Sequence, residues 1–124
     1  VDNRTTAVRV LNETPEATRS ELRVCGGDIH VHLAMAAYLA AGLDGIAKAT
    51  DPGAVSTGDL DEQDVARLPD DWGDALDAFD ASDWVKEAFG EEFCRNYSVV
   101  KRYEYGAFRR TVPETERKTY IEFL

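Results

Sequence analysis

The stretch TRSELRV (residues 18–24) places charged and uncharged side chains at alternate positions. In an extended strand alternate residues share a face, so Arg19, Glu21 and Arg23 would point the same way. The apolar residues of the stretch would lie on the opposite face, where they can enter a core. The stretch therefore predicts a β-strand with one Arg-Glu-Arg face and one apolar face.

The Arg-Glu-Arg face has the chemistry of a phosphate and metal site. Guanidinium groups bind phosphate and carboxylate oxygens bidentately, and a carboxylate between them can hold a divalent cation. A second arginine-bearing segment, NRTTAVRV (residues 3–10), precedes the stretch closely. An exposed strand face whose charges neutralise one another explains the same spacing, so the pattern alone leaves both interpretations open.

The pattern around this stretch predicts an α+β fold dominated by helices, with an N-terminal antiparallel strand pair. Residues 6–11 alternate and contain β-branched side chains, and turn-forming residues separate them from a second strand at 18–25, which together give a strand pair within 6–25. Residues 30–49 are rich in alanine and leucine and apolar on nearly every side. Such a helix is typically buried against other elements.

The second half of the chain is predicted to be an acidic connection over residues 50–73 followed by a helical segment over 74–124. Capping residues and periodicity place helices at 73–80, at 82–88, at about 90–110, and from Pro113 to near Phe123. An apolar stripe on the long helix is typical of a core: Phe93, Tyr97, Val100, Tyr103 and Phe108. Trp72 and Trp84 are expected to anchor the acidic segment.

The net charge of the 124-residue chain is −10 and is unevenly distributed. Residues 51–92 contain fourteen acidic residues and two basic ones, a local net charge of −12. No nucleic acid is expected as a partner, because phosphate binding needs clustered lysine and arginine. The carboxylates lack the loop spacing of a calcium site, so a solvated surface is predicted. An Asp-rich, Lys-poor surface suits concentrated salt, although an acidic mesophilic protein fits as well.

The sequence predicts a cytoplasmic protein with no membrane-spanning segment. The longest apolar span, residues 29–46, is interrupted by His30, His32 and other polar residues. Cys25 and Cys94 lie far apart without metal-type spacing and are expected to be reduced thiols. The chain shows neither a signal peptide nor an initiator methionine, so a section of a longer protein is expected.

Ordered motif blocks extend over the chain: NRTTAVRV (3–10), PEATRSELR (15–23), LAMAA with AGLDGI (33–46), DPG (51–53), FGEEF (89–93) and FRRTV (108–112). In this order and spacing they resemble the C-terminal part of the catalytic domain of the glutamine synthetase family. The matching family segments read NR-(S/T)-x-(A/S)-x-R-(I/V), P-x-A-x-R-x-E-x-R and LAxAAxLxAGLDGI. The resemblance covers essentially the whole chain and is far more specific than any one motif.

The resemblance implies part of an ATP-dependent ligase that forms glutamine from glutamate and ammonia through an acyl-phosphate. Arg4, Arg9 and Arg19 would hold the nucleotide phosphates and the acyl-phosphate. Glu21 would bind Mg²⁺ or Mn²⁺, and Arg23 would bind the amino-acid substrate and act with Arg4 in catalysis. Catalysis of phosphoryl transfer depends mainly on positioning and charge neutralisation, which arginines and a bound metal ion can supply.

The resemblance also implies a homo-oligomeric ring, in which a neighbouring subunit and earlier carboxylates of the chain complete the site. The 124 residues alone are therefore expected to be inactive. Two alternatives stay open for the parent protein. One is the γ-glutamylation of an organic amine, and the other is a non-catalytic structural or regulatory relative with the same fold.

Two departures from the family pattern bear on the acceptor amine and on activity. Glu16 stands where the family often has a lysine near the nucleotide, and its charge would repel phosphate unless it turns away. His30-Val31-His32 stands where many members read N-P-Y. A His-x-His pair can bind a metal, but a structural pair at a helix start is favoured because no third ligand is evident.

Overall fold

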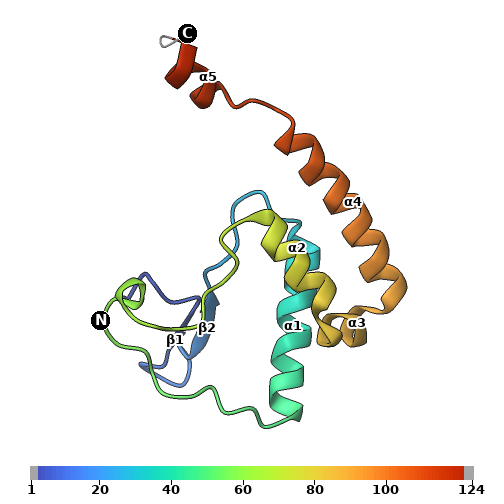
Figure 1. Cartoon of the computed structure of the whole chain (residues 1–124). Helices are drawn as coiled ribbons and strands as arrows, with labels where there is room; N and C mark the ends of the chain where they lie inside the picture. The colour runs from blue at the N-terminus through green and yellow to red at the C-terminus, as the bar shows by residue number, and fades with distance from the viewer. Residues whose placement is uncertain (1–2, 122–124) are drawn as a thin grey trace. The chain divides into compact units, whose positions relative to one another are not determined.

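The computed structural model describes residues 3–121, and the chain divides into two compact units, Val1–Ala66 and Arg67–Leu124. The first unit contains β1 (Val8–Leu11), β2 (Arg19–Leu22), α1 (Val31–Ala47) and the short 3₁₀ helix η1 (Leu60–Glu62). The second contains α2 (Trp72–Ala81), α3 (Asp83–Phe89), α4 (Glu91–Arg109) and α5 (Glu114–Tyr120) (Figure 1). The predicted α+β fold, dominated by helices and carrying one antiparallel strand pair, is confirmed.

The register of β1 and β2 decides which side chains share a face of the strand pair. Arg9 lies opposite Glu21, and Val8 lies opposite Leu22. Because faces alternate along each strand, the charged residues share one face, on which Leu11 also lies, and the other face carries Val8, Val10, Ser20 and Leu22. The apolar face does not enter a core as predicted: Val8 is 49% exposed and Val10 65%. Composition identified an apolar face, but none of the described elements buries it.

Helix α1 forms where predicted, but it is not the buried helix that its composition indicated. Its first turn is capped by His30, whose Nδ1 accepts the Leu33 N–H at 3.4 Å. No residue of α1 is buried, and its apolar stripe is 56–78% exposed (Met35, Leu39, Leu43 and Ile46). An apolar composition indicates that a helix can be buried, but burial also requires a neighbouring surface that covers it. No helix among residues 3–121 is long and apolar enough to cross a membrane.

The second unit has a small core between α4 and the pair α2 and α3 (Figure 1). Leu76 of α2 and Cys94 of α4 are its most buried apolar residues, at 4% and 7% exposure. The ring of Phe79 lies 5.2 Å from that of Tyr97 between centroids, a contact that joins α2 to α4. Gly90 has φ +84°, which is accessible to glycine at little cost, and this turn ends α3 and begins α4.

The predicted apolar stripe on α4 is correct for some of its residues and wrong for others. Phe93 stacks on Tyr97 with centroids 5.8 Å apart. Phe108 contacts Trp72 with centroids 5.6 Å apart, but it is 68% exposed and is not part of a core. Tyr103 is 77% exposed, and Val100 is 53% exposed. Six residues separate Tyr97 from Tyr103, which places them about 120° apart around an α-helix, so the two cannot share one face.

The acidic connection and the last helix also follow the sequence closely. Residues 51–71 are exposed apart from Leu60, and η1 is their one regular element. α5 begins directly after Pro113, as the fixed φ of proline favours. The predicted end of this helix near Phe123 lies outside the described residues.

A hydrogen-bonded charge network joins α2 to α4. Arg102 donates to Asp77 Oδ1 at 2.7 Å and also to the carboxylate of Asp80, while the Ser98 hydroxyl donates to Asp80 Oδ2 at 3.0 Å. These bonds from Arg102 and Ser98 hold the pKa of Asp80 below its usual range. Ser98 is itself buried, so its bond to Asp80 also gives a buried hydroxyl group a hydrogen-bond partner where α2 packs on α4.

Asp80→Asn is expected to destabilise the second unit at neutral pH and to have little effect in strong acid. A depressed pKa means that the ionised form stabilises the fold above the ordinary aspartate range near pH 4, and that this stability is lost as the pH falls through the native value. Because Asp80 is 39% exposed, screening limits the loss at pH 7 to about 0.5–1 kcal/mol. Urea unfolding at pH 7 and pH 3 measures the loss in the free energy of unfolding, with the exposed Asp70→Asn as control. An equal loss at both pH values would contradict the assignment.

Candidate functional site

Glu21 lies between two arginines on the charged face of the strand pair. Its Oε2 is 3.7 Å from Arg9 Nη1, and its Oε1 is 3.6 Å from Arg19 Nε. The register produces this arrangement, because Arg9 is the cross-strand partner of Glu21 and Arg19 is two residues before it on β2. Both distances are too long for charge-assisted hydrogen bonds, so the arginines neutralise the carboxylate without occupying its lone pairs.

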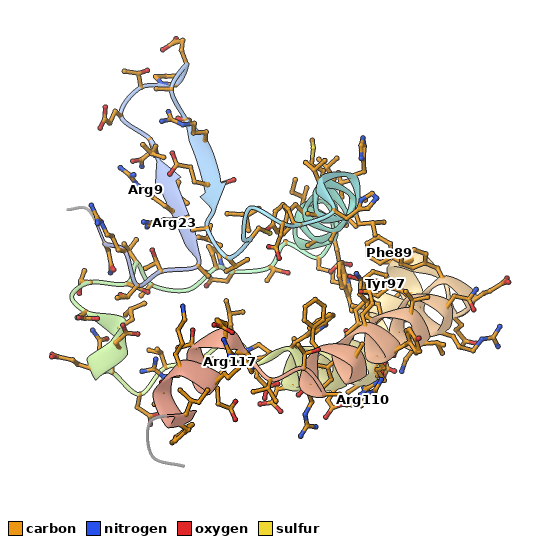
Figure 2. All side chains as sticks on the ribbon, turned by 90° about the horizontal axis from the view of Figure 1, so that it is seen from above. Arg9, Arg23, Phe89, Tyr97, Arg110 and Arg117 are labelled. Carbon is orange, nitrogen blue, oxygen red and sulfur yellow. The ribbon has the colours of Figure 1, made fainter. Side chains whose placement is uncertain are left out.

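Arg23 extends the same face beyond the end of β2. Its backbone N–H donates to the Ala7 carbonyl at 2.9 Å, which continues the pairing of the two chain segments. Its guanidinium Nη1 donates to the backbone carbonyl of Asn3. Arg9 and Arg23 lie on the same side of the strand pair in Figure 2. The structure thus brings together four of the five predicted site residues.

Arg4 is the exception among the predicted residues. It is exposed and lies before β1, and its side chain makes no hydrogen bond or ion pair within the part of the chain that the structure describes. The remaining four residues form a row with three positive charges and one negative charge. A net positive row in a chain of net charge −10 is suited to an anionic ligand such as phosphate or a carboxylate.

Glu21 fits a hard divalent cation as one ligand of a larger set. Its carboxylate is 37% exposed, and carboxylate oxygens are the ligands that Mg²⁺ prefers. Within residues 3–121 there is no group of three or more His, Cys, Asp or Glu side chains that could hold a metal. His30 acts as the cap of α1, with its ring 5.7 Å from that of His32, so the predicted structural role of this pair is supported.

Asn3 is a site residue to which the sequence reasoning gave no role. Its carbonyl accepts a hydrogen bond from the Arg23 guanidinium, and its side chain accepts one from the Thr5 N–H at 2.9 Å. The available signal was the Asn-x-Thr spacing before a strand, because asparagine side chains commonly bond the backbone two residues on.

A separate hollow in the second unit contains none of the predicted site residues. It has a volume of about 340 Å³ and mixed charges along its walls, which are formed by Phe79, Asp80, Lys86, Glu91, Cys94 and Arg95. Asp80 is already engaged by Arg102 and Ser98. The strand pair is therefore the candidate site.

Residues 1–120, which include the whole arginine row, match the family described as glutamine synthetase, catalytic domain. The chain belongs to the glutamine synthetase family. The glutamine synthetase of Halobacterium salinarum is 34% identical over 128 residues, which cover 97% of this chain and 28% of the relative.

Two further relatives have names that refer to an organic amine or its amide rather than to glutamine. The gamma-glutamylethanolamide synthetase of Streptomyces coelicolor is 34% identical over 121 residues, covering 98% of this chain and 26% of the relative. The glutamate–methylamine ligase of Methyloversatilis universalis is 33% identical over 117 residues, covering 86% of this chain and 26% of the relative. The chain thus spans 26–28% of the length of these three relatives.

Proposed function

We propose that this chain is the arginine-bearing section of the catalytic domain of an ATP-dependent ligase that joins glutamate to ammonia or an amine. The observation that carries the proposal is the row of Arg9, Arg19, Arg23 and Glu21 on one face of the strand pair, with Glu21 between two arginines at 3.6 and 3.7 Å. Membership of the glutamine synthetase family supports it.

In the proposed reaction the glutamate side-chain carboxylate attacks the γ-phosphorus of ATP, ADP leaves, and an acyl-phosphate forms. The amine then displaces phosphate from that acyl group. Arg4, Arg9 and Arg19 would neutralise the phosphate oxygens, which gather charge as the phosphoryl group moves. Arg23 would bind a carboxylate of the amino acid, which its planar guanidinium matches bidentately.

Glu21 would contribute one carboxylate to the binding of Mg²⁺ or Mn²⁺. A bound divalent cation supplies charge neutralisation at the phosphate oxygens. The two flanking arginines keep the Glu21 side chain on the charged face, where it can meet a cation shared with the nucleotide.

Ammonia is the first choice of acceptor and an organic amine the second. The second choice is favoured by the similarity of the chain to a gamma-glutamylethanolamide synthetase and to a glutamate–methylamine ligase. His30-Val31-His32 stands at the start of α1 where many members of the family read N-P-Y, and this departure bears on the same choice.

The test is an assay of the full-length protein for ADP release that requires glutamate, Mg²⁺ and an amine together. We expect turnover with ammonia, ethanolamine or methylamine, and the product separates the two acceptor classes. The 124-residue chain alone is expected to give no turnover, because Glu21 is the one acidic residue that the described strands β1 and β2 place on the charged face, and a metal site needs further ligands.

Two measurements on the full-length protein accompany the assay. Saturating ATP and Mg²⁺ should raise its melting temperature, since a ligand that binds only the native state stabilises it. Absence of both turnover and this shift would favour a structural or regulatory relative. We also propose that the full-length protein forms a homo-oligomeric ring, and light scattering would measure the molecular mass of the assembly.

A further inference from the structure

We infer that Asn3 and Thr5 are positioning residues, which tie the loop at 57–62 to the guanidinium of Arg23. We call these two side chains the Asn3–Thr5 node. The inference rests on the proposed function, because it assigns the node an effect on the arginine that would bind the amino-acid substrate. It adds a structural connection between that arginine and a segment more than 30 residues away in the sequence.

Within the node each polar atom has a defined partner. Asn3 Oδ1 accepts the Thr5 N–H at 2.9 Å and the Thr5 hydroxyl at 2.7 Å, which closes a turn just before β1. The Thr5 hydroxyl therefore has its single proton committed to Asn3, and its oxygen is left as an acceptor. The direction of this bond makes Thr5 suited to hold a backbone N–H from elsewhere.

The node holds the loop at two points. The Leu60 N–H donates to Thr5 Oγ1 at 3.0 Å, and Asn3 Nδ2 donates to the Gly58 carbonyl at 2.8 Å. Both bonds join residues 55 positions apart in the sequence. The loop is also braced internally, because Gln63 Nε2 donates to the carbonyls of Thr57 and Asp59 at 3.0 Å each. The loop is therefore expected to move as one unit, and its hydrogen bonds to the node would move Asn3 with it.

The same Asn3 holds Arg23 through its backbone. Its carbonyl accepts a hydrogen bond from Arg23 Nη1, while the Arg23 N–H is fixed by Ala7 at 2.9 Å. The second bond fixes the main chain of Arg23, and the first orients its guanidinium. A bidentate contact with a carboxylate depends on that orientation, so a shift of Asn3 should weaken substrate binding more than it affects protein folding.

Substitutions in the full-length protein test the node. Thr5→Val keeps the shape of the side chain but removes the acceptor for Leu60, and Asn3→Asp replaces the donor to Gly58 by a carboxylate oxygen. Thr5→Ser keeps the hydroxyl and should therefore behave like the wild type. Thr57→Val makes the same change as Thr5→Val on the exposed loop, where the hydroxyl has no hydrogen-bond partner among residues 3–121.

We expect Thr5→Val and Asn3→Asp to raise the KM for glutamate about 3- to 10-fold, the range that follows from one net hydrogen bond. The KM for ATP should change less than about 2-fold, because Arg23 is assigned to the amino acid. Thr57→Val and Thr5→Ser should leave both constants near wild type. Equal effects of Thr5→Val and Thr57→Val, or equal changes in the two KM values, would overturn the positioning role.

Hydrogen exchange of the Leu60 amide gives a readout that does not depend on activity. It should exchange at least about 3-fold faster in Thr5→Val than in Thr57→Val, because only the first loses its acceptor. Unchanged exchange would overturn the link between the loop and the node. A wild-type protein that neither turns over nor binds glutamate by calorimetry would overturn the proposed function and with it the role of Arg23, whereas Leu60 exchange would still decide the link.

Discussion

Replacement of Glu21 with alanine in the full-length protein is expected to lower ligase turnover by about 100-fold or more. Among the residues of β1 and β2, Glu21 is the one acidic side chain on the face with Arg9 and Arg19, and its oxygens accept no hydrogen bond from residues 3–121. Loss of a carboxylate that binds Mg²⁺ removes charge stabilisation of several kcal/mol, and each 1.4 kcal/mol corresponds to about a factor of ten. The Mg²⁺ concentration for half-maximal turnover should rise as well.

Glu21→Gln separates the charge of this residue from its shape. It keeps an oxygen between the arginines but removes the negative charge, so it should resemble Glu21→Ala in the metal titration. Asp70→Ala is the matched control, since Asp70 is an exposed acidic residue remote in sequence from the strand pair. It should change turnover less than about 2-fold, as surface substitutions usually do.

The opposing interpretation is that the row is a solvated strand face with self-neutralising ion pairs. On that interpretation Glu21→Ala would act only by leaving Arg9 and Arg19 without their shared counter-charge. Exposed ion pairs of this kind contribute about 0–1 kcal/mol, so melting would shift slightly and the metal titration would not move. Similar effects of Glu21→Ala and Asp70→Ala on turnover would reject the metal assignment.

The strand pair and the helix ends could be predicted because they follow from local rules. The period of two in TRSELRV placed Arg19, Glu21 and Arg23 on one face, and the observed register opposite β1 agrees with it. Ser82 at the start of α3 accepts the Val85 N–H at 3.2 Å, which is the bond that a capping serine favours. Such signals lie within a few residues of the structure that they specify.

Burial and long-range contacts could not be predicted in the same way. The composition of α1 indicates an apolar helix, but the 64% exposure of Leu39 depends on whether another surface covers it. The Asn3–Thr5 node joins residues 55 positions apart, and no period or cap in the sequence relates Asn3 to Gly58. The same holds for Ser98, whose burial follows from the packing of α2 on α4.

Leu76→Ala is expected to lower the free energy of unfolding of the second unit by about 2–3 kcal/mol. Leu76 is the most buried apolar residue among those described, at 4% exposure, and it lies on α2 where that helix packs against α4. Truncation of a buried leucine loses transfer free energy and leaves a cavity that neighbouring side chains fill only partly. The small size of this core places the expected loss at the lower end of the usual range of 2–5 kcal/mol.

Urea unfolding of the 124-residue chain followed by tryptophan fluorescence measures this loss, because both tryptophans of the chain, Trp72 and Trp84, lie in the second unit. The control is Leu68→Ala, the same truncation at a residue of this unit that is 59% exposed, and it should cost less than about 0.5 kcal/mol. Since Leu76 does not belong to the charged row, its effect on turnover should follow the fraction unfolded and leave the Mg²⁺ requirement unchanged. If both leucine variants unfolded at the same urea concentration, the packing of α2 on α4 would not be the source of the stability of this unit.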